Sequence, residues 1–360
     1  MRDKIFQLIN EGEKYRQKSK YKEALKIFKK TYYLSRKIGD IKGTLDSAFV
    51  VADIYRITGD FDRAIKYYTD SLEICEAIGD ELTAADSLVG IGLSLRATGM
   101  WKEGMKFLKR AQNVYNKKGD KKGLAFSIWA EAGTHRVAGN IKKAIEKFNL
   151  SKDIFSDIKF RSGIAYTLCG LGGAHRIAGY YKESLDFYKR ANKMFTDLND
   201  KFGRAYSHCG IGNAWRMTNN YENAINHFKD ATKLYEEIGD IVSYSYTLWS
   251  FANIYKMIHD YETTKRYIEK AMKNFKKTRD PRGMLYCYLT LSEIDFLMNK
   301  KGSAIKKLGF AQDIATKHDF KLEECHVKTL LQEISGINIK NCYKKIGVNL
   351  EFSGIPFNIP

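Results

Sequence analysis

The chain has 360 residues, of which 44% are hydrophobic and 29% charged, and its formal net charge at pH 7 is +19. This apolar fraction excludes an intrinsically disordered chain, because it suffices for a packed core. The positive charge predicts attraction to anionic partners such as acidic peptides, nucleic acid or a lipid surface, without selecting among them.

The chain opens with MRDKIFQLINEGEKYRQ, whose charges predict an amphipathic helix rather than a signal peptide. Turn-like pairs then recur at multiples of twenty residues: Gly39-Asp40, Gly59-Asp60, Gly79-Asp80, Gly119-Asp120, Gly139-Asn140, Asn219-Asn220 and Gly239-Asp240. Glycine readily takes the left-handed conformation that ends a helix, and Asp or Asn caps the next one. The spacing therefore predicts helix, tight turn and helix, with a period of forty residues.

Between these turns the apolar pattern is helical. Ala64, Tyr68, Ser71 and Cys75 share one helix face, as do Ala224, Phe228, Ala231 and Tyr235 four repeats later. Only three prolines occur, at 281, 356 and 360, so the strongest helix breaker is nearly absent before residue 335. No apolar run approaches the roughly 20 residues that a membrane span needs. The sequence predicts an all-α protein.

Two runs, YRITGDFDRAIKYYTDSLEI at 55–74 and WRMTNNYENAINHFKDATKLY at 215–235, resemble the tetratricopeptide repeat (TPR). The small residue of the first helix stands at Gly12, Ala52, Gly92, Ala132, Gly172, Gly212 and Ala252, and the alanine of the second helix at Ala24, Ala64, Ala144, Ala224 and Ala304. The forty-residue length is most similar to Pins-type adaptors, kinesin light chain and the peptide-sensing TPR regulators of bacteria. This resemblance implies a right-handed superhelical solenoid of about eight helix pairs.

A solitary helix, KLEECHVKTLLQEIS, follows the repeats and is expected to cap the apolar end of the array. We therefore expect a solenoid over residues 1–335. The tail, residues 336–360, has glycine, asparagine and proline among alternating apolar residues, which predicts extended structure. It is expected to fold back on the solenoid, to pair with a second copy in a homo-oligomer, or to serve as a docking segment.

The resemblance also implies that the first helix of each pair faces a concave groove. Aromatic residues dominate one column of that face from Phe126 onward, and seven repeats carry a cation at another, from Arg16 to Lys256. The residues expected to bind a ligand in the middle repeats are Phe126, Trp129, Arg136, Tyr166, Cys169, Gly173, Arg176, Tyr206, Cys209, Asn213, Arg216, Tyr246, Trp249, Asn253 and Lys256.

Each part of this expected groove has a second interpretation. The cations either form an anion-binding ladder or bond the carbonyls at their own helix ends. The rings either contact a ligand or fill gaps between neighbouring first helices. The extra glycines Gly170, Gly173 and Gly210 indicate either closely packed helices or a ligand lying against bare helix, because a mid-helix glycine costs about 0.5–1 kcal/mol relative to alanine.

No signature of catalysis or metal binding accompanies these repeats. Glu131 stands where other repeats have apolar residues, and it is expected to pair with His135; His175 is expected to be a second hydrogen-bonded core imidazole. The six cysteines are scattered without CxxC spacing, which argues against a zinc knuckle or a disulfide framework and favours the reducing cytoplasm. We expect no catalytic residue, no metal and no cofactor.

The leading functional expectation is a non-enzymatic adaptor that binds a peptide or protein segment, acidic and with apolar anchors, along the concave groove. Two alternatives stay open at this point. Arginines interleaved with rings also suit single-stranded nucleic acid, whose phosphates and bases they contact. A receptor for an apolar small molecule also suits the glycine- and ring-lined middle repeats.

Overall fold

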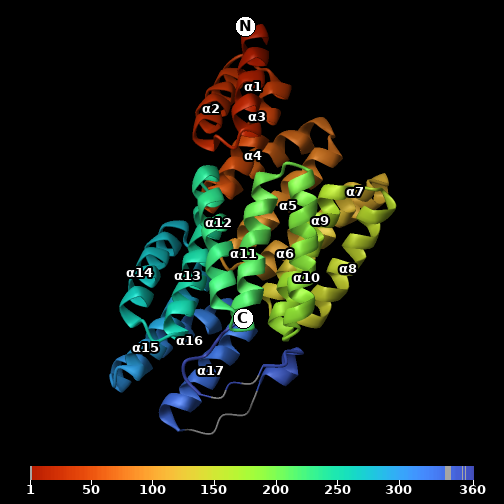
Figure 1. The fold of residues 1–360 in the computed structure, drawn as a ribbon. Helices are drawn as coiled ribbons and strands as arrows, with labels where there is room; N and C mark the ends of the chain where they lie inside the picture. The colour runs from red at the N-terminus through yellow and green to blue at the C-terminus, as the bar shows by residue number, and fades with distance from the viewer. Residues whose placement is uncertain (1, 337–341, 351, 353) are drawn as a thin grey trace. The chain divides into compact units, whose positions relative to one another are not determined.

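The computed structural model describes residues 2–336, 342–350, 352 and 354–360. Within these ranges the chain forms α-helices and one 3₁₀ helix, and no strand (Figure 1). The helices are α1 (Arg2–Gln17), α2 (Tyr21–Lys37), α3 (Ile41–Ile57), α4 (Phe61–Ile78), α5 (Glu81–Ala97), α6 (Trp101–Lys118), α7 (Lys121–Val137), α8 (Ile141–Asp157), α9 (Arg161–Ala178), α10 (Tyr181–Asp197), α11 (Lys201–Met217), α12 (Tyr221–Ile238), α13 (Ile241–Met257), α14 (Tyr261–Thr278), α15 (Pro281–Leu297), α16 (Lys301–His318), α17 (Lys321–Ser335) and η1 (Tyr343–Ile346). The all-α prediction is confirmed.

The turns lie where the twenty-residue spacing places them. Gly39, between α2 and α3, has a φ of 71°, in the left-handed region that glycine tolerates best. Asp40 then caps α3, since its side chain accepts a hydrogen bond from the main-chain N–H of Gly43 at 3.1 Å. Asp60 and Asp80 cap α4 and α5 in the same way. The predicted helix–turn–helix repeat is confirmed.

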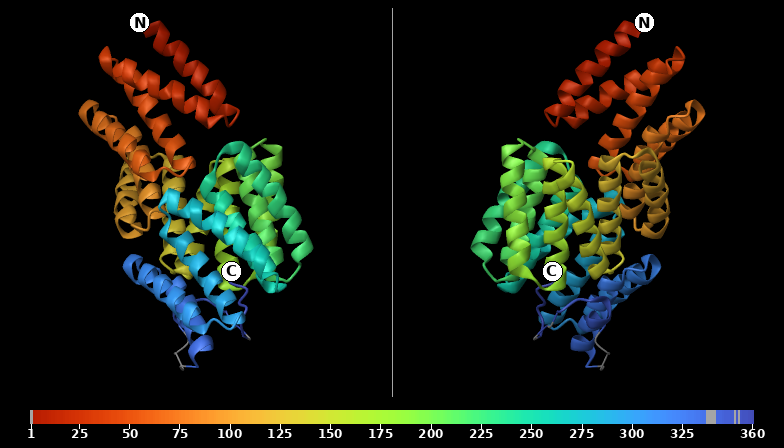
Figure 2. Two further views of the ribbon diagram at one scale, coloured as in Figure 1. Left: turned by 90° about the vertical axis from the view of Figure 1, so that its left-hand side faces the viewer. Right: turned by 90° about the vertical axis from the view of Figure 1, so that its right-hand side faces the viewer.

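The chain divides into two compact units. One consists of Met1–Ala130 with Tyr235–Ile241, and the other of Glu131–Leu234 with Val242–Pro360. Successive helices pack against each other within the units, as the two views of Figure 2 show for α1 with α2 and for α9 with α10. The seams are lined by small residues, such as the fully buried Ala24 and Ala64 in the first unit and Ala191 and Ala224 in the second. No helix in the described ranges is long and apolar enough to cross a membrane.

Part of the tail, residues 343–350, belongs to the core of the second unit. Residues of α8, α9 and α17 form one apolar cluster with the tail, made of Ile141, Ile177, Ala178, Leu322, Cys325, Tyr343, Val348 and Leu350. The main-chain N–H of Asn349 also donates to the carbonyl of Ala178, at 3.4 Å. Of the three possibilities for the tail, the structure therefore shows that it folds back on the repeats.

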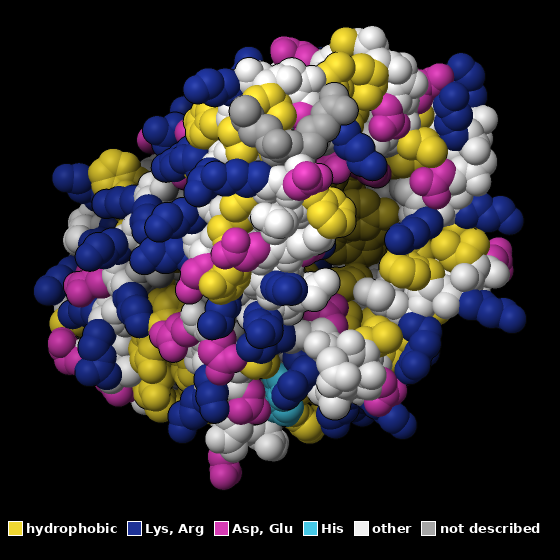
Figure 3. All heavy atoms as spheres, turned by 90° about the horizontal axis from the view of Figure 1, so that it is seen from above, with side chains coloured by type: hydrophobic (Ala, Val, Ile, Leu, Met, Phe, Trp, Pro, Cys, Tyr) yellow, Lys and Arg dark blue, Asp and Glu magenta, His cyan; other side chains and the backbone are white. Residues whose placement is uncertain are grey.

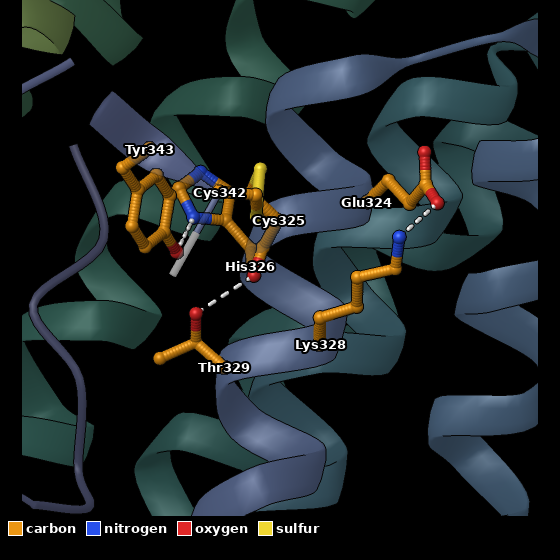
Figure 4. The surroundings of a disulfide bond; sticks show 7 residues. All are labelled: Glu324, Cys325, His326, Lys328, Thr329, Cys342 and Tyr343. Carbon is orange, nitrogen blue, oxygen red and sulfur yellow. Dashed lines mark hydrogen bonds and ion pairs between the residues drawn. A yellow bond between two sulfur atoms is a disulfide. The ribbon is translucent and has the colours of Figure 1, made fainter. Parts of the chain in front are cut away.

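One expectation about the cysteines is wrong. Cys325 on α17 and Cys342, just before η1, form a disulfide (Figure 4). Their spacing of 17 residues matches no CxxC motif, so the pair could not be recognised from the sequence. The other four cysteines, Cys75, Cys169, Cys209 and Cys287, are free.

Candidate functional site

Inward-facing polar residues of α11, α13 and α15 form a buried row in the second unit. We call Asn213, Arg216, Lys256 and Glu293 the polar row. Arg216, Lys256 and Glu293 are fully buried, and Asn213 is 7% exposed. The Lys256 ammonium lies 2.7 Å from the Glu293 carboxylate, and the Asn213 side-chain oxygen accepts hydrogen bonds from Arg216 Nε at 3.3 Å and Nη2 at 3.2 Å. Buried charges of this kind need partners, and the polar row supplies part of them.

The remaining partners come from the last residues of the chain, 354–360, which we call the C-terminal segment. Lys256 Nζ donates to the carbonyl of Phe357 at 2.7 Å, and Glu293 accepts from the N–H of the same residue at 2.6 Å. One residue's main chain is thus held between two opposite charges. In Figure 1 the C-terminus lies beside the end of α11, which carries Arg216.

Arg216 holds the next two residues of the C-terminal segment. Its Nη2 donates to the carbonyl of Ile359 at 2.8 Å, and its Nη1 donates to the side-chain oxygen of Asn358. The Asn358 amide nitrogen donates back to the carbonyl of Arg216 at 2.9 Å. Phe357 and Ile359 are each 1% exposed. The polar row therefore holds this segment through its main chain and one asparagine, and two of the segment's apolar side chains are buried. We call the space that the segment occupies beside the polar row the groove.

Burial shifts the pKa of every charged member of the polar row toward its neutral form. Desolvation lowers the pKa of Arg216 to about 9, and the nearby Arg176 adds to the effect. It also lowers the pKa of Lys256 and raises that of Glu293, while the attraction between these two opposes both shifts. The hydrogen bonds to the C-terminal segment help to offset this desolvation.

Arg176, at the end of α9, has unused donors in the second unit. Its Nε and Nη1 atoms are buried, and no residue in the described ranges accepts a hydrogen bond from them. A guanidinium cannot lose its charge easily, so buried donors without an acceptor are costly. An anionic or carbonyl group of a ligand would satisfy them.

The other members of the cation column have different partners. Arg16 pairs with Glu13, and Arg56 with Asp53 and the Tyr68 hydroxyl. Arg96 donates to the carbonyl of Ala130, at 3.2 Å. None of these four contacts is with a carbonyl of the cation's own helix end. The cations of the column therefore do not share one role: they do not all bond the carbonyls at their own helix ends, and they are not all unpaired.

The predicted aromatic residues are mostly packed. Trp249 is 5% exposed and donates its indole N–H to the carbonyl of Tyr286 at 3.2 Å. Tyr166 and Tyr246 are half-buried, and each packs edge-on against a phenylalanine. Tyr206 is half-buried as well. For Trp249 the structure favours the interpretation that rings fill gaps between neighbouring first helices.

Phe126 and Trp129 belong to the first unit, where their rings stack with centroids 5.5 Å apart, and Phe126 is 41% exposed. Phe126 also lines a cavity of 280 Å³ whose walls include Phe49, Asp53 and Asp86. The Asp86 carboxylate accepts a hydrogen bond from the Tyr115 hydroxyl at 2.5 Å, and Asp53 is paired with Arg56. Both carboxylates therefore have hydrogen-bond partners within the unit, and only Asp53 is paired with a cation.

The extra glycines make room for aromatic rings. A Cβ atom at Gly210 would lie 2.1 Å from the Tyr188 ring, and one at Gly170 would lie 2.3 Å from the Phe148 ring. At Gly173 it would lie 2.3 Å from the Arg136 guanidinium. Close packing against a ring therefore explains Gly170 and Gly210, whereas Gly173 faces the end of a flexible arginine side chain.

The remaining predicted residues are structural in their contacts. Cys169 is fully buried, and the Cys209 thiol accepts a hydrogen bond from the Thr247 hydroxyl at 3.3 Å. Asn253 donates to the carbonyl of Trp249 at 2.9 Å, while its buried side-chain oxygen has no hydrogen-bond partner among the described residues.

The expected pair of Glu131 and His135 is confirmed. Glu131 is 1% exposed, and its carboxylate lies 3.4 Å from His135 Nε2 and 3.7 Å from Lys147 Nζ. His175, expected as a hydrogen-bonded imidazole, lies 2.9 Å through Nδ1 from the carbonyl of Leu171. Both contacts are local polar bridges.

One cluster was missed by the sequence analysis. His208 on α11 and His227 on α12 bring their Nδ1 atoms within 2.9 Å of each other, and the Asp230 carboxylate lies 3.7 Å from His208 Nδ1. Nitrogen and carboxylate donors of this kind can hold a divalent metal ion. Burial lowers the pKa of both imidazoles, and Arg204 and Lys189 add to this effect at His208 and His227 respectively. A hydrogen bond between two neutral imidazoles accounts for the same geometry. The 19-residue separation explains why no motif was visible.

Beneath the C-terminal segment, a second set of contacts anchors the tail to α17 (Figure 4). The fully buried His326 lies 2.8 Å through Nδ1 from the Tyr343 hydroxyl. Burial lowers the pKa of His326 to about 3, and Arg282 adds to the shift. Together with the Cys325–Cys342 disulfide, this neutral imidazole ties η1 to the repeats.

Lys and Arg side chains do not gather in one patch on the face drawn in Figure 3; they are spread over it among acidic and apolar side chains. The net charge of +19 is therefore a property of the whole surface seen there rather than of one basic stripe. This arrangement attracts anions at long range without marking a binding site.

Comparison with known proteins identifies the repeat. Residues 8–77 and 163–237 match the family described as tetratricopeptide repeat. These segments are tetratricopeptide repeats. No curated protein matches the chain by sequence.

Solved structures of TPR proteins are similar to this chain. A Rap protein in complex with Competence and Sporulation Factor is 13% identical, over 93% of this chain and 98% of that chain, with a TM-score of 0.59. The Rap conjugation gene regulator of plasmid pLS20, in complex with the Phr* peptide, is 13% identical over the same shares, with a TM-score of 0.62. A kinesin light chain from Podosopora anserina is 14% identical over 53% of this chain and 94% of that chain, with a TM-score of 0.39. For the two Rap proteins, at 13% identity, the likeness concerns the fold alone.

Proposed function

We propose that this TPR protein is a non-enzymatic adaptor that binds an extended peptide or protein segment in the groove lined by the polar row. The observation that carries the proposal is the main chain of Phe357, which Lys256 and Glu293 hold from two sides. Such contacts do not depend on the side chain of the bound residue. The same groove can therefore receive a segment of another molecule.

Arg176 supports an acidic group in that partner. Two of its guanidinium nitrogens are buried without an acceptor in the described ranges, in the same unit as the polar row. A carboxylate of a ligand would form charge-assisted hydrogen bonds there, worth about 1.5–3 kcal/mol. The net charge of +19 would also speed the approach of an acidic partner.

The similar structures support the same class of partner. Two Rap proteins of this fold were solved in complex with Competence and Sporulation Factor and with the Phr* peptide. The adaptor proposed here needs no catalytic residue and no cofactor, because binding alone performs its role. Single-stranded nucleic acid is not part of the proposal, since several cations of the column are already paired with carboxylates.

The proposal includes a cytoplasmic location, which the four free cysteines support. The Cys325–Cys342 disulfide weighs against it, because disulfides are rare in reducing compartments. A homo-oligomer formed through the tail is not included, since the C-terminal segment is bound within its own chain.

The test begins with the intact chain, purified from its source without denaturation. Native mass spectrometry is expected to detect a retained peptide, whose synthetic copy is then titrated into the wild type and two variants. Arg176→Ala should weaken binding about tenfold or more, as expected for loss of a charge-assisted hydrogen bond. Arg161→Ala is the control, because this exposed arginine on the same helix pairs with the exposed Asp197.

A retained oligonucleotide or small molecule in place of a peptide would overturn the proposal. So would a peptide whose affinity responds equally to the two substitutions, because such a peptide binds through general charge attraction rather than at Arg176.

A further inference from the structure

We infer that residues 354–360 are a resident ligand of the groove, and that a partner segment binds by displacing them. This inference rests on the function proposed above and adds how the site is regulated and what sequence it prefers. It is carried by the contacts of the C-terminal segment with α11, α13 and α15.

The C-terminal segment is held as a bound peptide is held. Its residues from 357 to 360 belong to no helix or strand, and its hydrogen bonds with the polar row join residues 64 to 143 positions apart in the sequence. Three different helices supply these side chains, through Arg216, Lys256 and Glu293. A peptide that binds by adding its main chain to preformed polar groups uses the same kind of contact.

The C-terminal segment can be released while the upstream part of the tail stays bound to the repeats. The tail upstream of it has contacts of its own, namely the apolar cluster around Tyr343, Val348 and Leu350 and the Cys325–Cys342 disulfide. One ring contact joins the two parts, since Phe357 stacks on Phe352, which packs against that cluster, with ring centroids 4.3 Å apart. No residue of 354–360 belongs to that cluster. Its release breaks no helix, because residues 357–360 belong to no helix or strand.

The contacts also define the preferred ligand. Asn358 both accepts a hydrogen bond from Arg216 and donates one to the carbonyl of Arg216. Aspartate lacks the donor, and leucine lacks both groups. On either side, Phe357 and Ile359 are buried. The groove therefore selects an extended segment with the pattern apolar, asparagine, apolar.

Tethering gives the resident segment an advantage over a free one. A short linker holds a segment near its site at an effective concentration on the order of 1 mM. If the resident segment as a free peptide has a dissociation constant of about 10–100 µM for the empty groove, tethering it therefore weakens the binding of any competing peptide about 10- to 100-fold. Only ligands that bind tightly or are present at high concentration displace the resident segment from the groove.

The experiment uses a fluorescent synthetic peptide, GIPFNIP, which copies residues 354–360. Its binding is measured by fluorescence anisotropy to the intact chain, to a chain that ends at residue 353, and to full-length Asn358→Ala. We expect clear binding to the shortened chain, about 10- to 100-fold weaker binding to the intact chain, and an intermediate value for Asn358→Ala. A peptide with leucine in place of the asparagine lacks both the donor and the acceptor, so it should bind the shortened chain at least tenfold more weakly.

Four results would overturn the inference. Equal affinity for the intact and shortened chains would mean that the segment does not close the groove. No binding to a folded shortened chain would mean that the segment is no ligand. Early melting of the shortened chain would show that the segment belongs to the core. A concentration-dependent dimer that exchanges tails would place the segment in a second copy. Each of these leaves the proposed function to be judged by the peptide retained from the source and by Arg176→Ala. That substitution leaves the contacts of the C-terminal segment with Arg216, Lys256 and Glu293 in place.

Discussion

The buried pair of Lys256 and Glu293 gives the sharpest prediction about stability. Lys256→Ala removes a 2.7 Å ion pair and a 2.7 Å hydrogen bond to the carbonyl of Phe357, and it leaves the Glu293 carboxylate fully buried. Breaking a buried pair on one side typically costs about 3–5 kcal/mol, because the remaining charge is uncompensated. We expect a loss of that size in the free energy of unfolding, measured by urea denaturation and tryptophan fluorescence.

The double variant Lys256→Met with Glu293→Gln isolates the reason for this loss. It removes both charges, retains an amide oxygen that can accept from the N–H of Phe357, and fills the space of the lysine stem. At least half of the stability lost in Lys256→Ala should therefore return. Equal losses in the single and double variants would refute the reasoning, since the cost would then come from lost packing rather than from a stranded charge.

Three further predictions concern the packing and the tail. Gly210→Ala should destabilise the protein by about 1–3 kcal/mol in urea denaturation, because the added Cβ would meet the Tyr188 ring. Gly309→Ala is the control: its Cβ would meet nothing within 4 Å, so it should stabilise the protein by about 0.5–1 kcal/mol. Equal effects of the two substitutions would contradict the account of the glycines. The pKa of His326 is about 3 in the folded chain, below its value of about 6.5 in the unfolded chain. The neutral imidazole therefore makes its full contribution to the free energy of unfolding above about pH 6.5, and this free energy should fall by about 2 kcal/mol between pH 7 and 5. The variant His326→Phe should flatten that dependence, and an unchanged slope would mean that other groups cause it. Cys342→Ser should lower the free energy of unfolding by up to about 3 kcal/mol, since the disulfide closes a loop of 17 residues. It should also speed amide hydrogen exchange at residues 343–350 more than in α9. Equally faster exchange in both regions would show that the disulfide does not anchor the tail.

The sequence predicted the repeat because each turn is encoded locally. Gly39 takes a positive φ and Asp40 caps the following helix within three residues of its own position. Such signals do not depend on the rest of the fold, and their recurrence every twenty residues specified the helix boundaries. The pairing of Glu131 with His135 was predictable for the same reason, since one helical turn separates them.

The groove was harder to predict because its decisive contacts are distant in sequence. Arg216 and Lys256 were recognised as members of a cation column, but their partners lie 142 and 101 residues away at Asn358 and Phe357. Glu293 follows Asn213 and Asn253 at intervals of forty residues, so it has the same place in its repeat, yet its contact with the C-terminal segment could not be predicted. The buried asparagine, glutamate and cation positions were a signal that something polar must meet them, without indicating what.

The central claim is that the groove holds an extended segment by its main chain, and hydrogen exchange at the amide of Phe357 tests it most directly. That N–H donates to a fully buried carboxylate, so its exchange in the intact chain should be slowed well beyond the rate of an unstructured peptide. The protection should persist in Arg176→Ala and vanish when a displacing peptide saturates the groove. Exchange at the rate of an unstructured peptide in the intact chain would contradict the account.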